Sequence, residues 1–134
     1  MKSILTAAAL SLAASAAMAD VQTYQLDPSH SQIVFNYSHL GFSNTYGMYS
    51  GFEGTLMLDA NDPSTASVSV TMPADTMITG WDARSGHFLQ SGDFFKLDEF
   101  PDVTFISTSV EVTGEETALI TGDLSLNGVT KSVV

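Results

Sequence analysis

Apolar and polar residues alternate along several stretches of the chain, which is typical of β-strands that bury one face. In residues 31–39 the odd positions carry Ile33, Phe35, Tyr37 and His39, and most of the positions between them are polar. The same alternation recurs in four further stretches: 51–59, 66–72, 103–106 and 118–126. The pattern therefore predicts roughly six or seven strands, each with one apolar face.

The facing of one strand becomes ambiguous after Ile106. A β-bulge there would insert one residue, so that the apolar side chains that follow would lie at even instead of odd positions of the sequence. Asn127-Gly128 is the strongest hairpin signal in the chain, and residues 129–134 are predicted to form the returning strand. The chain stops inside that strand, so we expect the last strands of the fold to be missing from it.

Residues 82–99 break the strand pattern. Asp82 is predicted to cap a short helix that runs to Leu89 and is followed by the aromatic pair Phe94-Phe95. Together with Trp81 and Phe88, these rings would form a lid or mouth. One-sided strands with one short helix predict an antiparallel all-β barrel or sandwich, and periodicity alone does not choose between the two.

The first nineteen residues have the parts of a secretory signal peptide. Met1-Lys2 is positively charged, an apolar stretch follows, and Ala17-Met18-Ala19 matches the small-x-small cleavage pattern. The apolar stretch is shorter than the ~20 residues that a membrane-spanning helix needs. We expect residues 1–19 to be cleaved, one mature domain over residues 20–134, and localisation in the periplasm.

Charge and cysteine content narrow the function classes. Without Lys2, three basic residues remain against fifteen acidic ones, a net charge of −12. Such a balance repels phosphate backbones and anionic membranes, so we expect no nucleic-acid partner and no stable membrane insertion. The sequence does not decide whether the protein forms a homodimer. Cysteine is absent, so the domain has to fold without disulfides.

A set of short motifs occurs in order along the chain. They are Asp27-x-x-His30-Ser31, Ile33-x-Phe35, His39-Leu40-Gly41-x-Ser43, Gly47-x-Tyr49-x-x-Phe52-x-Gly54, Arg84-x-x-His87, Ser91-x-Asp93-Phe94-Phe95, Phe100-Pro101-x-Val103-Thr104-Phe105 and Gly122-x-Leu124-x-Leu126-Asn127-Gly128-Val129-Thr130-Lys131. In this ordered set the chain resembles the YceI-like family of exported proteins. The resemblance implies an extended, lipocalin-like antiparallel β-barrel. It also implies an apolar tunnel that holds polyisoprenoid or another long-chain amphiphile of isoprenoid or fatty-acid type.

Large flexible and aromatic side chains are the candidates for lining such a tunnel, because they offer area and adaptable rotamers. They are Phe35, Tyr37, Phe52, Leu56, Met72, Trp81, Phe88, Phe94 and Phe105. For each, ordinary core filling is the alternative. His39, Arg84 and His87 are the candidates for a polar head-group site, as donors to a phosphate, hydroxyl or quinone oxygen. Their alternative is a set of polar groups satisfied by backbone carbonyls or carboxylates.

Metal and catalytic chemistry are not expected. The spacing of His30, His39 and His87 matches no compact metal-ligand pattern, and no cofactor is implied. Neither Gly-x-Ser-x-Gly nor His-Glu-x-x-His occurs. The leading hypothesis is a lipid carrier rather than an enzyme. The alternatives are a small hydrolase-like enzyme that uses His87 with Asp93, and a stress-related structural domain with a filled core.

Overall fold

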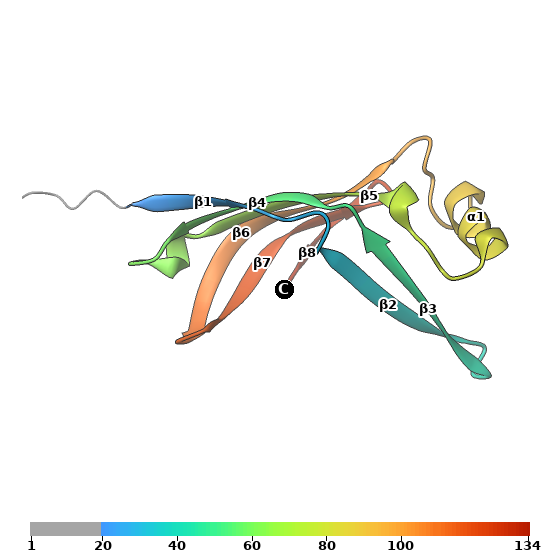
Figure 1. The fold of residues 1–134 in the computed structure, drawn as a ribbon, viewed down its shortest axis with the longest axis horizontal. Coiled ribbons are helices and arrows are strands. Elements are labelled where there is room, and N and C mark those ends of the chain that lie inside the picture. The colour runs from blue at the N-terminus through green and yellow to red at the C-terminus, as the bar shows by residue number, and fades with distance from the viewer. Residues whose placement is uncertain (1–19) are drawn as a thin grey trace, which may run out of the picture.

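The computed structural model describes residues 20–134, so the predicted signal peptide lies outside the described residues. Within these residues the chain forms eight strands and one α-helix (Figure 1). The strands are β1 (Val21–Gln25), β2 (Gln32–His39), β3 (Ser43–Ser50), β4 (Glu53–Asp59), β5 (Ser67–Pro73), β6 (Asp102–Gly114), β7 (Thr117–Leu126) and β8 (Val129–Val133). The helix α1 spans Asp82–Gln90, and two 3-10 turns span Pro63–Thr65 and Ala74–Thr76.

Six strands form one antiparallel sheet in the order β1-β4-β5-β6-β7-β8, and β2 and β3 form a separate hairpin. Figure 1 shows the hairpin projecting from the sheet at the end where α1 lies. A β-bridge joins it to the segment before α1, where Met48 and Ile78 exchange two backbone hydrogen bonds of 2.9 Å, and the Ser50 amide donates to the Thr76 hydroxyl at 3.4 Å.

The fold is antiparallel and mostly β, as predicted, but the expected β-barrel is not closed in residues 20–134, where the sheet is open with β1 and β8 at its edges. A barrel closes only when its edge strands pair with each other. Here the β1–β4 and β2–β3 ladders are separated by the turn at 26–31 and by Gly51, whose φ of +73° bends the chain. The hairpin therefore leaves the plane of the sheet, and β2 pairs with β3 alone within the described residues.

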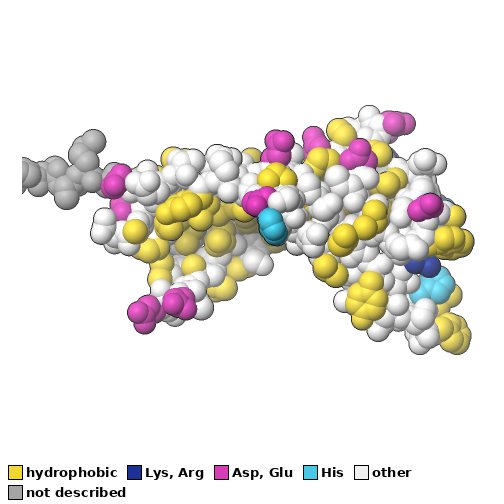
Figure 2. Space-filling view, in the orientation of Figure 1, with side chains coloured by type: hydrophobic (Ala, Val, Ile, Leu, Met, Phe, Trp, Pro, Cys, Tyr) yellow, Lys and Arg dark blue, Asp and Glu magenta, His cyan; other side chains and the backbone are white. Residues whose placement is uncertain are grey.

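The alternation predicted from the sequence does place most apolar side chains of the sheet on one face, with Met57 and Ile106 among the exceptions. The bulge expected after Ile106 appears as a register shift between Ser107 and Ser109. It moves the apolar positions of β6 from odd, as in Phe105, to even, as in Val110. Figure 2 shows hydrophobic side chains gathered in the hollow beneath the sheet.

Two local predictions can be checked against the backbone. Asn127 and Gly128 form the β7–β8 turn with φ of +52° and +76°, as a two-residue hairpin turn requires. The helix is present, but Asp82 is its first residue and not its cap. Trp81 precedes the helix with an extended backbone, and its carbonyl accepts hydrogen bonds from the amides of Arg84 and Ser85.

The core is small and lies where the end of β3, the start of β4, the end of β5 and the start of β6 meet. Its buried side chains are Tyr49, Phe52, Met72, Ala74, Met77 and Val103. Phe35, Phe88 and Phe95 pack against it from the hairpin and from the helical segment. No helix within residues 20–134 is long and apolar enough to cross a membrane.

Candidate ligand-binding cleft

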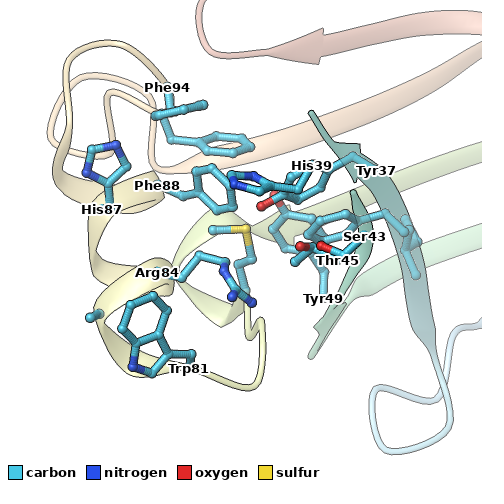
Figure 3. A pocket seen from close by; sticks show the side chains of 15 residues that line it. Tyr37, His39, Ser43, Thr45, Tyr49, Trp81, Arg84, His87, Phe88 and Phe94 are labelled. Carbon is cyan, nitrogen blue, oxygen red and sulfur yellow. The ribbon is translucent and has the colours of Figure 1, made fainter. Parts of the chain in front are cut away.

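A cleft of about 890 Å³ lies between the β2–β3 hairpin and the segment that holds α1 (Figure 3). It is lined by Ile33, Phe35, Tyr37, His39, Ser43, Thr45, Tyr49, Met77, Trp81, Ala83, Arg84, His87, Phe88, Phe94 and Phe95. Seven of these fifteen residues are Phe, Tyr or Trp, and none is an Asp or Glu. The cleft is therefore an apolar, ring-lined surface without negative charge in a strongly acidic protein.

The hairpin wall follows from strand alternation, because successive side chains of a strand point to opposite faces. The odd positions of β2 from Ile33 to His39 all line the cleft. Phe35 is the cross-strand partner of Gly47, and a Cβ built on Gly47 would lie 2.3 Å from the Phe35 ring. The missing side chain at Gly47 lets this ring lie flat across β3 and reach Tyr49, 5.6 Å away between ring centroids.

The helical wall is an aromatic cluster built by α1 and the turn that follows it. The Phe88 and Phe94 rings meet edge to face at 4.7 Å, and the His87 ring lies 5.3 Å from Phe94. A backbone hydrogen bond of 3.1 Å from the Phe95 amide to the Phe88 carbonyl folds the turn back onto the helix. Edge-to-face pairs at such distances contribute about 0.5–1.5 kcal/mol beyond the area that they bury.

Two ring contacts join the two walls of the cleft. Tyr37 of the hairpin meets Phe88 edge to face at 5.9 Å, and Tyr49 meets Phe95 in the same way at 6.4 Å. Burial raises the pKa of Tyr49 above its ordinary value, so its phenol stays neutral at physiological pH. The contacts between the two walls are thus made by uncharged rings.

The three predicted head-group residues line the cleft but do not converge on one point. Figure 3 shows Arg84 beside Trp81 and His87 beyond Phe88 as seen from the hairpin, whereas His39 belongs to the hairpin wall. The Arg84 guanidinium lies 5.4 Å from the centre of the Trp81 ring and donates one hydrogen bond of 3.3 Å to the Thr79 carbonyl. A guanidinium has five N–H donors, so donors remain for a ligand.

The predicted apolar residues divide into two groups. Phe35, Tyr37, Trp81, Phe88 and Phe94 line the cleft. The others lie in the sheet: Phe52 and Met72 are buried in the core, and Leu56 and Phe105 are half-buried on the apolar face, away from the cleft.

Several lining residues were not among the candidates. Ile33 belongs to the alternation of residues 31–39, and Phe95 belongs to the aromatic pair after the helix, so both patterns are visible in the sequence. Tyr49 was less visible, because the positions that share its face, Ser43, Thr45 and Gly47, are small or polar and hide the alternation.

A family model described as the YceI-like domain matches residues 24–134. The chain belongs to the YceI-like family. The resemblance drawn from the ordered motifs is confirmed. A UPF0312 protein of Ectopseudomonas mendocina is 41% identical to this YceI-like chain over 136 residues, which cover all of the chain and 71% of the relative. Protein YceI of Shigella flexneri is 40% identical, over 98% of the chain and 69% of its own length.

Solved structures show the same fold. A Campylobacter jejuni YCEI protein is 31% identical, with a TM-score of 0.63 over 82% of this chain and 64% of that chain. BcnA of Burkholderia cenocepacia is 20% identical, with a TM-score of 0.67 over 76% of this chain and 64% of its own. This YceI-like chain thus spans about two thirds of the length of these two solved proteins.

The side chains considered for catalysis, His87 and Asp93, and those considered for metal binding, His30, His39 and His87, form no such site in the described residues. The Asp93 amide is hydrogen-bonded to the Ser91 hydroxyl, and no ion pair joins His87 to Asp93 within residues 20–134.

His30 pairs with Asp27 at 2.7 Å in the exposed turn between β1 and β2. Hydrogen bonds from the Ser29 hydroxyl, the His30 side chain and the Ser29 amide lower the pKa of Asp27. No group of three His, Asp or Glu side chains in the described residues is placed to hold a metal ion.

Proposed function

We propose that this chain is a periplasmic binding protein that holds a long-chain amphiphile, of polyisoprenoid or similar type, in the cleft between the β2–β3 hairpin and α1. The observation that carries the proposal is the composition of the cleft. Two facing walls of rings border a cleft of about 890 Å³, a volume in the range of small-molecule sites. An apolar chain gains about 0.8 kcal/mol for each methylene that such walls remove from water, before ordering costs are subtracted.

The rim favours a ligand with a polar or anionic head. His39, Arg84 and His87 offer N–H donors, and no carboxylate among the described lining residues would repel a phosphate. The chain of the ligand would then lie along Phe35, Tyr37 and Phe88, with its head toward the rim. Such a protein sequesters or carries its ligand without breaking a bond, and the predicted signal peptide would deliver it to the periplasm.

The proposal is tested by titration with a long-chain polyprenyl phosphate. Trp81 is the only tryptophan of the chain and lines the cleft, so its fluorescence reports occupancy. Phe88→Ala removes the ring that contacts both the hairpin and Phe94, and we expect it to weaken binding about tenfold, which corresponds to 1.4 kcal/mol.

The matched control is Ile106→Ala, which shortens an exposed apolar side chain of β6 outside the cleft. This variant should bind as the parent does. Equal affinity of the parent and of folded Phe88→Ala would contradict binding in the cleft.

A further inference from the structure

The turn that joins β2 to β3 exposes two large apolar side chains. Leu40 is 80% exposed and Phe42 is 91% exposed. The turn is well defined, because the Phe42 amide donates to the His39 carbonyl at 3.0 Å and the Gly41 amide donates to the Ser38 hydroxyl at 3.2 Å. Leu40 holds a φ of +54°, a conformation that a Leu side chain rarely adopts. A fixed turn thus presents two apolar groups to solvent.

The hairpin is also the neutral part of an acidic protein. Residues 28–52 contain no Asp, Glu, Lys or Arg, although the chain carries fifteen acidic residues. The tip of the β6–β7 hairpin, by contrast, is negatively charged because it carries Glu115 and Glu116. Figure 2 shows acidic side chains at the tip of the hairpin on the left of the view and none on the β2–β3 hairpin at lower right. Phospholipid head groups therefore meet no repelling carboxylate at the β2–β3 tip.

The tip is continuous with the rim of the cleft. His39 and Ser43, the residues on either side of Leu40-Gly41-Phe42, both line the cleft. Trp81, across the cleft, is 61% exposed. Aromatic side chains with a polar atom favour the interface between lipid and water. A surface that touched the tip would therefore also lie beside the opening of the cleft.

We propose that the β2–β3 tip docks reversibly on the surface of a phospholipid bilayer, with Leu40 and Phe42 inserted among the head groups. Docking brings the cleft opening to the bilayer, so that a lipid chain can pass between the two without crossing water. The route of exchange rests on the proposed function, whereas docking itself is a separate property that is measured separately.

Vesicle flotation tests the docking. The purified full chain is mixed with vesicles of phosphatidylethanolamine and phosphatidylcholine, which carry no net charge. We expect the parent to float with the vesicles. The double variant Leu40→Asn with Phe42→Ser should partition about tenfold less, which corresponds to 1.4 kcal/mol. Asn is chosen at position 40 because it tolerates positive φ.

The control is Ile106→Ser. Ile106 is 57% exposed on the polar face of the six-stranded sheet, whereas the tip belongs to the separate β2–β3 hairpin. It should float as the parent does. Docking is overturned if the parent stays in solution or if the folded double variant floats equally well. It is also overturned if the parent forms a dimer that the double variant loses while neither binds vesicles, because the tip would then contact a second copy.

Lipid extracted from the same preparations separates the two proposals. A parent that fails to float but releases a long-chain lipid refutes docking and leaves the cleft proposal standing. A parent that floats but shows no ligand in its cleft, and no Trp81 response to polyprenyl phosphate, supports docking and refutes the cleft proposal.

Discussion

Phe35 can reach Tyr49 only because Gly47 lies beneath its ring. A Cβ at position 47 would approach the ring to 2.3 Å and the Ile78 carbonyl to 3.0 Å, so the ring would have to turn away. The sequence showed Phe35 on an apolar strand face, but the role of Gly47 depends on cross-strand register. Register is set by pairing and turn geometry, and a single sequence does not display which residue lies opposite another.

Gly47→Ala should therefore destabilise the protein and disturb the cleft. We expect a loss of about 1–3 kcal/mol in the free energy of unfolding, as for an overpacked site. Urea denaturation monitored by Trp81 fluorescence measures it. Gly92→Ala is the control, because a Cβ there meets nothing within 4 Å. An unchanged midpoint for Gly47→Ala would show that the ring does not lie over β3 in solution.

The helix α1 places most of the helical wall, although it is short and lacks a side-chain cap. It is nine residues long, its interior contains Gly86, and no side chain caps its start. Helices of this length are marginal alone, so packing of Phe88 and Leu89 against the core has to stabilise it. Sequence reasoning found the helix from the break in strand alternation. It misplaced the start because Asp82 is favoured both at a cap and in a first turn.

Gly86→Ala should stabilise the helix. A Cβ at this position meets nothing within 4 Å, and Ala loses less backbone entropy than Gly on folding. We expect a gain of about 0.5–1 kcal/mol in the free energy of unfolding, seen as a higher melting temperature. Gly80→Ala has equally open space but a φ of +74°, so it should destabilise. If both variants lower the melting temperature, residues 82–90 are not helical in solution.

At the scale of the whole molecule, alternation predicted which faces are apolar but not what each face contacts. A period of two assigns Phe52 and Phe35 equally to the interior, yet one lies in the core and the other in the cleft. The difference arises from the bend near Gly51, which turns the hairpin away from the sheet and toward α1. A barrel and an open sheet share the same alternation, because closure depends on edge pairing between strands far apart in the chain.

The arrangement of the molecule separates a small core from a larger, ring-lined cleft. A protein that merely filled its interior would bury those rings, whereas Trp81 and Phe94 remain exposed at the rim. Exposed apolar surface of this kind is typical of binding sites in proteins and supports the proposed function. Occupancy of the cleft by a long-chain amphiphile is therefore the property to measure.

Native mass spectrometry of the protein recovered from the periplasm measures that occupancy. We predict a species that begins at Asp20 and carries one long-chain amphiphile, which organic extraction removes and Phe88→Ala largely loses. Recovery of the ligand-free mass alone, with no adduct after incubation with polyprenyl phosphate, would contradict the binding function.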